Sequence, residues 1–285
     1  MDPYEVLNRP AEGPDAVLRY AEHADGVVDV FLPASLGRPD SPAPLLFLVH
    51  GGFWRQEWDR RHVRPLAGEL ARRGFVVAVP EYRRVGGAGG WPMTGYDVRD
   101  AFAATPPMIE AVAPGRLDPA APAVVTGHSA GGHLALWVGL HAPVERVARI
   151  VALAPVSDLR LAAAVDMGDG AAQALLGGGP DDVPQHYAEA DATGLLPGRL
   201  PVTIVQGTED KQVTVEMNRT LAAAHRDAPS FRYVELQSVE HFALIDPLTE
   251  AFESAVWPAL SVSEPRPNPP AEIGHGRSPV SPDPA

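Results

Sequence analysis

The stretch Gly127-His128-Ser129-Ala130-Gly131-Gly132 follows an apolar run, Ala123-Val124-Val125-Thr126, and precedes a stretch with helical character. Glycine two residues before and two residues after a serine, between a strand and a helix, is typical of the sharp turn that carries a serine nucleophile. Such a turn exposes the Ser129 hydroxyl and directs the Ala130 N–H toward the same point. The pattern therefore predicts a nucleophile at Ser129; a glycine-rich loop with a buried serine is the alternative.

A second glycine motif, His50-Gly51-Gly52-Phe53-Trp54, stands at the end of the apolar run 45–49. Stabilising a negatively charged oxygen needs backbone N–H groups that converge on one point, and glycine allows the sharp turn that this requires. We expect the N–H groups of Gly52 and Phe53 to join that of Ala130 in an oxyanion hole. His50 is expected to anchor the loop, and a tight turn without chemistry is the alternative.

A serine nucleophile needs a base, and the base needs an acid that orients it. Asp210 and His241 each follow an apolar run, so both lie where parallel strands end and where sites in such sheets form. The order serine, acid, histidine fits a nucleophile that follows a strand in this way. We predict Asp210 as the acid and His241 as the base. Glu209 is a rival for the acid, and Asp158 is a weaker one.

Short apolar runs alternate with helical stretches along the chain. The runs are residues 27–32, 45–49, 75–79, 123–126, 149–153, 202–205 and 231–236. The helical stretches are residues 59–73, 96–113, 131–141, 214–225 and 247–260. This alternation predicts an α/β fold, a mostly parallel central sheet flanked by helices.

The composition along the chain suggests how it is organised. Residues 1–43 are expected to form an N-terminal extension with the first strand or strands, and residues 44–260 a catalytic domain. Residues 158–199 are rich in glycine and weakly periodic, which predicts a short lid inserted over the strand ends. Residues 261–285 hold many prolines and few large apolar side chains, so we expect a disordered tail.

Charge and composition exclude several functions. The 285 residues carry 36 acidic and 23 basic side chains, a net charge of −13, which argues against nucleic-acid binding and a polybasic membrane patch. The absence of cysteine excludes thiol catalysis, and Lys211 is the only lysine. No targeting segment or membrane-length apolar run is present, so we expect a cytoplasmic protein. The predicted serine nucleophile and oxyanion hole favour a small-molecule ester or amide as substrate. Monomer and homodimer both remain open.

Neither a metal nor a cofactor is expected. His128 and His133 stand five residues apart, which does not place them on one helical face. Trp54, Tyr82 and Trp91 all follow predicted strands, and we expect them to bind substrate, with ordinary packing as the alternative.

Taken together, the two glycine motifs resemble those of the α/β-hydrolase superfamily. The resemblance covers residues 45–260. Within this superfamily, His50-Gly51-Gly52-Phe53-Trp54 is similar to the motif of the kynurenine formamidase (arylformamidase) group, which runs His-Gly-Gly, aromatic, Trp. Esterases like hormone-sensitive lipase usually carry a third glycine at the position of Phe53. The resemblance implies a serine hydrolase with Ser129, Asp210 and His241 as its triad. It further implies that the enzyme cleaves a small ester or aryl formamide through an acyl-enzyme, as in the kynurenine formamidase group. A general carboxylesterase like hormone-sensitive lipase and a non-catalytic binding protein of the same fold are the alternatives.

Overall fold

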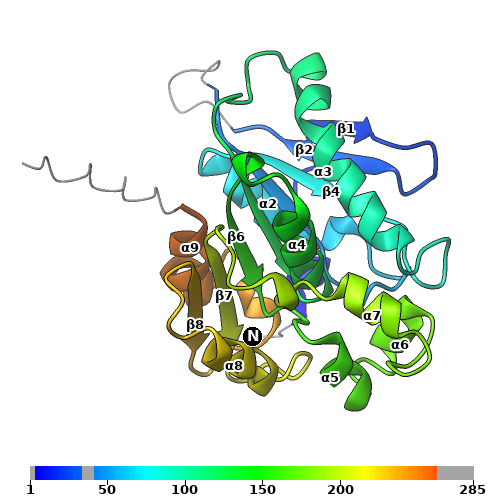
Figure 1. The fold of residues 1–285 in the computed structure, drawn as a ribbon. Coiled ribbons are helices and arrows are strands. Elements are labelled where there is room, and N and C mark those ends of the chain that lie inside the picture. The colour runs from blue at the N-terminus through cyan, green and yellow to red at the C-terminus, as the bar shows by residue number, and fades with distance from the viewer. Residues whose placement is uncertain (1–3, 34–41, 262–285) are drawn as a thin grey trace, which may run out of the picture.

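A computed structural model describes residues 4–33 and 42–261 (Figure 1). Its centre is one sheet of eight strands in the order β1-β2-β4-β3-β5-β6-β7-β8. The strands are β1 (Ala16–Arg19), β2 (Val27–Phe31), β3 (Leu45–Val49), β4 (Val76–Pro80), β5 (Ala123–His128), β6 (Val147–Leu153), β7 (Val202–Gly207) and β8 (Phe231–Leu236). The strands from β3 to β8 run parallel, while β1 and β2 add an antiparallel edge. The α/β fold class predicted from the sequence is confirmed.

The apolar runs of the sequence become central strands because both faces of the sheet are covered. In β3, Leu45, Phe47 and Val49 join one apolar cluster, while Leu46 and Leu48 join another on the opposite face. This alternation is the two-residue period of an extended chain. A strand with helices on both sides needs apolar residues at every position, which explains the unbroken run LLFLV.

Helices cover each face of the sheet. They are α1 (Glu5–Asn8), α2 (Arg64–Arg72), α3 (Met93–Val112), α4 (Ala130–His141), α5 (Leu159–Ala164), α6 (Ala171–Leu176), α7 (Pro184–Ala190), α8 (Val215–Ala224) and α9 (Trp257–Ser261). Side chains of α3, α4 and α8 belong to the first apolar cluster, and those of α1, α2 and α9 to the second. No helix in the described part of the chain is long and apolar enough to cross a membrane.

Some boundaries differ from the sequence-based expectation. β1 was not among the predicted runs, because only one of its four residues is buried and its apolar pattern is short. The single helix expected over residues 247–260 is instead a π-helical turn, Phe252–Val256, that leads into α9. The expected disordered tail lies outside the described residues, except for Ser261.

Residues 158–199, predicted to form a lid, fold into α5, α6 and α7. In Figure 1 these helices lie beside the end of the sheet toward which β6 and β7 run. The backbone of Trp91 donates a hydrogen bond to Leu175 in α6 at 2.7 Å. The Arg55 side chain donates to the carbonyl of Asp169 at 2.9 Å. The segment is therefore attached to the loops that follow β3 and β4.

Candidate active site

Ser129 occupies a sharp turn between β5 and α4. Its backbone has φ 58° and ψ −122°, a conformation that side-chain-bearing residues rarely adopt. A Cβ on Gly127 would lie 2.1 Å from the carbonyl oxygen of Gly131, and one on Gly131 would lie 2.2 Å from that of Val49. Both positions accept only glycine unless the backbone moves. This is the crowding that the glycine pattern around Ser129 predicted.

Asp210 and His241 meet at the carboxyl ends of β7 and β8. The Nδ1 atom of His241 lies 2.6 Å from Oδ2 of Asp210, and both side chains are buried. A carboxylate can only accept, so the hydrogen bond fixes the proton on Nδ1 and leaves Nε2 of the neutral ring as a proton acceptor. The structure therefore brings the predicted acid and base together in the orientation that a base needs.

Ser129 and His241 line the same cavity. The other lining residues are Tyr4, Leu7, Gly52, Phe53, Trp58, His62, His128, Gln212 and Phe242. Among the described residues, no hydrogen bond joins the Ser129 hydroxyl to His241. Catalytic contacts of this kind are often long without substrate and shorten when it binds.

The loop after β3 supplies the predicted oxyanion donors. Gly52 has φ 108° and Phe53 has φ 50°, so the chain turns sharply there. The hydrogen bonds of the described residues leave the N–H groups of Gly52 and Phe53 without an acceptor. Ala130 begins α4, where a backbone N–H has no partner within the helix. A Cβ at Gly51 would come within 3.2 Å of the Ser129 Cβ, so this loop lies against the nucleophile.

His50 acts as an anchor, as expected from the sequence. Its Nε2 lies 2.8 Å from the Glu81 carboxylate and its ring stacks on Tyr82 at 4.4 Å. Burial alone would raise the pKa of Glu81, but His50, Arg84 and the Arg60 N–H outweigh it and lower the pKa to about 2. Glu81 is therefore ionised and holds the loop that carries the oxyanion donors.

His128, the residue before the nucleophile, connects the nucleophile turn to the base. Its Nε2 donates to the carbonyl oxygen of His241 at 3.0 Å, and the two rings lie 4.2 Å apart. Burial, with the neighbouring His241, holds the pKa of His128 well below its usual range, so the ring stays neutral. Sequence reasoning assigned His128 no role in positioning His241.

Buried amide side chains orient Asp210. Gln206 donates to Oδ2 of Asp210 at 3.0 Å, and Asn218 of α8 donates to Gln206 at 2.7 Å. The Ser157 hydroxyl donates in turn to Asn218 at 2.7 Å. Buried polar groups linked in this way hold one another in a single arrangement. We call this chain of hydrogen bonds, from Ser157 through Asn218 and Gln206 to Asp210, the relay; it connects the predicted acid to α8.

We predict that Asn218→Leu lowers kcat on short p-nitrophenyl esters by about 10-fold, because Gln206 loses its partner and Asp210 its fixed orientation. Initial rates and thermal unfolding, measured side by side, check this. The exposed neighbour Arg219 gives a matched control, Arg219→Leu, which is expected to keep the wild-type kcat. Equal kcat in wild type and Asn218→Leu would contradict a role for the relay.

The three aromatic residues predicted to bind substrate lie elsewhere. Trp54, Tyr82 and Trp91 are at most 7% exposed, and none lines the cavity at Ser129. Trp54 and Trp91 pack near the ring of His133, and the Tyr82 hydroxyl donates to the carbonyl of His50. These side chains follow the strands as predicted but turn into the core.

Other aromatic residues supply the wall of the cavity, and sequence reasoning missed most of them. Tyr4 and Phe242 face each other with ring centroids 5.2 Å apart, and Phe53 and Trp58 also line the cavity. Phe242 stands directly after His241, which is the one signal that could have indicated it. Tyr4 precedes α1, more than a hundred residues from Ser129 in sequence, and carries no such signal.

An ion pair holds the N-terminal segment against the cavity. Arg9 forms a two-pronged contact with Asp246, whose second hydrogen bond measures 2.8 Å. Val6 inserts into the second apolar cluster and is 2% exposed. These contacts position Tyr4 and Leu7 at the site.

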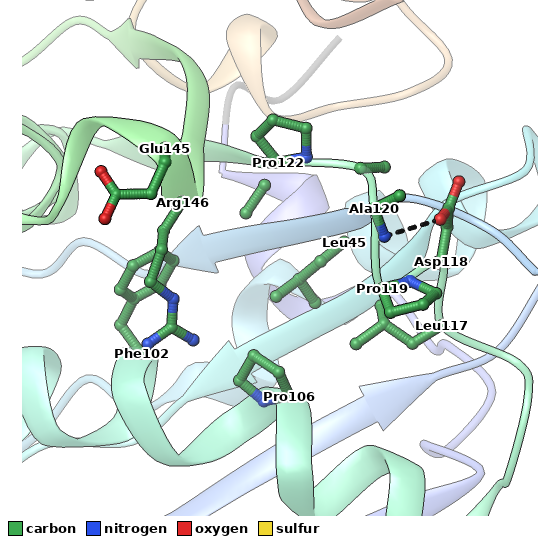
Figure 2. A pocket seen from close by; sticks show the side chains of 12 residues that line it. Leu45, Phe102, Pro106, Leu117, Asp118, Pro119, Ala120, Pro122, Glu145 and Arg146 are labelled. Atoms are coloured by element: carbon green, nitrogen blue, oxygen red, sulfur yellow. Dashed lines mark hydrogen bonds between the residues drawn. The ribbon is translucent and has the colours of Figure 1, made fainter.

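A further cavity lies at the opposite end of the sheet, where β3 and β5 begin (Figure 2). Prolines form much of its wall, and its Asp118 carboxylate accepts a hydrogen bond from the Ala120 N–H at 2.9 Å. Parallel sheets place their sites at the carboxyl ends of the strands, and this cavity holds no serine–histidine pair. The candidate active site is therefore the cavity at Ser129. In the described ranges, no three potential metal ligands cluster.

Buried neutral histidines make stability dependent on pH. Burial lowers the pKa of His133 to about 4 and that of His128 well below its usual value. Between pH 6.5 and 5 the unfolded chain therefore takes up protons that the folded chain does not bind. The free energy of unfolding should fall with falling pH, by up to about 1.4 kcal/mol per unit for each histidine.

Thermal unfolding at pH 7, 6 and 5 measures this effect. The unfolding midpoint of wild type should fall as the pH is lowered. The midpoint of His133→Phe should fall less steeply, because this variant lacks one of the titrating histidines. An unfolding midpoint that stays constant from pH 7 to pH 5 would contradict the prediction.

Comparison with known proteins gives a family match and structural likenesses. The BD-FAE family model matches residues 28–224. A kynurenine formamidase of Drosophila melanogaster is 43% identical over 65 residues, which cover 23% of this chain and 20% of that protein. The chain thus matches only a fifth of the length of this curated relative.

Solved structures share the architecture. Esterase B from Lactobacillus rhamnosis has a TM-score of 0.68 and is 20% identical, with 88% of this chain and 87% of that one covered. A thermophilic esterase from the Planctomycetes species Thermogutta terrifontis has a TM-score of 0.64 and is 20% identical, with 89% and 94% covered. At these identities the likeness shows the α/β-hydrolase fold.

Proposed function

The chain belongs to the BD-FAE family, and from this premise we propose that it is a serine hydrolase that cleaves small esters and aryl formamides. One observation carries the proposal. Ser129, on its strained turn, and the hydrogen-bonded pair His241–Asp210 come together at a single apolar cavity. That combination of nucleophile, base and orienting acid is what acyl transfer to a serine requires.

In the proposed reaction, Nε2 of His241 accepts the proton of the Ser129 hydroxyl while Oγ attacks the substrate carbonyl. Asp210 keeps the other ring proton on Nδ1 and stabilises the positive charge that forms on the ring. The N–H groups of Ala130, Gly52 and Phe53 hydrogen-bond the carbonyl oxygen as it becomes negative.

The acyl-enzyme then forms and is hydrolysed. His241 returns its proton to the leaving alcohol or amine as the bond to the acyl carbon breaks, which leaves the acyl group on Ser129. A water molecule gives a proton to His241 and attacks the carbonyl carbon of the acyl-enzyme. His241 then passes that proton to Oγ of Ser129 as the bond from Oγ to the acyl carbon breaks, which releases the carboxylic acid and restores Ser129. His241 thus carries every proton transfer, and the backbone N–H groups only stabilise the negative oxygen.

The cavity supports a small substrate with an aromatic part. Its lining is mainly apolar and aromatic, with a few polar groups, as is usual for small-molecule sites. The rings of Tyr4, Trp58 and Phe242 offer flat apolar surfaces to an aryl leaving group. Together with the local match to a kynurenine formamidase, this favours an aryl formamide over an extended chain. We further propose that residues 158–199 act as a lid beside this cavity.

Two measurements test the proposal. Initial rates on N-formylkynurenine and on short p-nitrophenyl esters, taken side by side, separate the substrate classes. A higher kcat/KM for the formamide supports the formamidase assignment, while ester turnover with negligible formamide turnover makes the protein a general carboxylesterase. Failure of a fluorophosphonate probe to label the wild-type protein would instead indicate a non-catalytic binding protein.

A further inference from the structure

His62 lies in the cavity at Ser129 and has no part in the reaction described above. It belongs to a short 3-10 helix, Arg60–Val63, which begins after Asp59. The Asp59 side chain accepts a hydrogen bond from the N–H of Arg61 at 2.8 Å and so fixes the start of that helix. The backbone that carries His62 is therefore held in one conformation.

The surroundings of the His62 ring determine which of its two nitrogens carries the proton. Nδ1 lies 2.6 Å from the carbonyl oxygen of Asp59, and because a carbonyl only accepts, Nδ1 carries the proton. Burial lowers the pKa of His62 to about 4, and the neighbouring His50 acts in the same direction. The ring is therefore neutral near pH 7, and Nε2 presents a lone pair.

The ring is also held in place while Nε2 remains available. His62 meets the ring of His50 edge-on at 5.6 Å and that of Trp58 at 6.1 Å. Within residues 4–33 and 42–261, Nε2 has no hydrogen-bond partner. Unlike Nδ1 of His133, it is not sealed in the core. The result is a fixed hydrogen-bond acceptor at a cavity whose other walls are mainly aromatic.

We propose that Nε2 of His62 accepts a hydrogen bond from an N–H group of the substrate, which fits the cavity to secondary formamides as well as esters. This inference rests on the proposed function and names the substrate group that His62 recognises. An ester has no hydrogen on its leaving oxygen, whereas a secondary formamide has one on its leaving nitrogen. That N–H loses water when it enters an apolar cavity and needs a new acceptor.

The same contact would assist the chemistry of a formamide. When the carbonyl carbon becomes tetrahedral, the lone pair of the leaving nitrogen must face His241 to receive its proton. A hydrogen bond from the N–H to His62 would hold the nitrogen in that orientation. His62 is then a specificity-determining residue that acts by direct contact with the leaving group.

The test compares formanilide, which has an N–H, with N-methylformanilide, which has none. Both are measured as competitive inhibitors of p-nitrophenyl acetate hydrolysis by wild type, His62→Phe and His62→Gln. Phenylalanine keeps a ring but removes the acceptor, and glutamine restores an acceptor oxygen. In wild type formanilide should bind more tightly than its methylated partner, by about 10-fold or more.

His62→Phe should abolish that preference, and His62→Gln should restore part of it. An equal preference in wild type and His62→Phe, or no preference in wild type, would overturn the inference. Inhibition can be measured without turnover of formanilide. Absent formamide hydrolysis would therefore refute the proposed formamidase function, whereas an unchanged inhibition ratio would refute the role of His62.

Discussion

Ser129→Ala is expected to lower kcat on short p-nitrophenyl esters by a factor on the order of 10⁴–10⁶, because the chain loses the atom that forms the acyl-enzyme. The remaining oxyanion donors and the cavity would still bind substrate, so KM should change far less than kcat. Alanine keeps the Cβ of serine and faces the same backbone conformation, φ 58°. The variant should therefore fold like wild type.

Covalent labelling gives an independent measurement of the same prediction. A fluorophosphonate probe should label wild type and leave Ser129→Ala unlabelled. Ser230 provides a control, because its hydroxyl donates to the carbonyl of Gly198 and does not line the cavity, so Ser230→Ala should keep the labelling. Labelling that survives Ser129→Ala would show that another residue is the nucleophile.

The second large effect is expected for Asp210→Asn, with a loss of about 10³–10⁴ in kcat. One carboxylate oxygen accepts hydrogen bonds from the N–H groups of Gln212 and Val213, each at 2.8 Å. An asparagine must place its oxygen there, because backbone N–H groups can only donate, whereas the Gln206 amide and the His241 ring at the other oxygen can each present an acceptor instead. The NH₂ then faces His241 and forces the ring proton onto Nε2. In that form the ring cannot accept the Ser129 proton.

Two comparisons check this prediction: the kcat of Asp210→Asn against wild type, and the kcat of the matching change at the neighbouring residue Glu209. Glu209, the rival acid, is exposed and provides the control, Glu209→Gln, with kcat expected near the wild-type value. Thermal unfolding shows whether Asp210→Asn remains folded. A large loss in Glu209→Gln with a small one in Asp210→Asn would transfer the role of the acid to Glu209.

The structure brings Ser129, Asp210 and His241 together at one end of the sheet, as the sequence predicted, because each position depends on local constraints. Only glycine fits beside Ser129, and strands buried on both faces appear as unbroken apolar runs. Asp210 and His241 follow such runs, so the parallel sheet brings them to one edge. No knowledge of side-chain direction was needed for these residues.

The substrate-facing residues could not be predicted in this way because their placement depends on direction and distant packing. Phe53 and Trp54 adjoin one another, both with positive φ, yet Phe53 lines the cavity and Trp54 lies in the core. A shift of one residue along this turn therefore decides which side chain lines the cavity and which packs in the core. The role of Asn218 could not be predicted either, because a single buried amide in a helix leaves no recognisable pattern in the sequence.

The Arg9–Asp246 pair has a practical consequence for how this enzyme family is compared. Part of the cavity wall, Tyr4 and Leu7, lies ahead of residues 28–224, the stretch that the family model matches. Alignments limited to that stretch would group proteins that share Ser129 and Asp210 but differ in these parts of the wall, and they would also leave out His241. An affinity tag or fusion partner joined ahead of residue 4 would be attached next to a residue of the cavity wall. Selectivity measured on differently tagged proteins would then report partly on the tag.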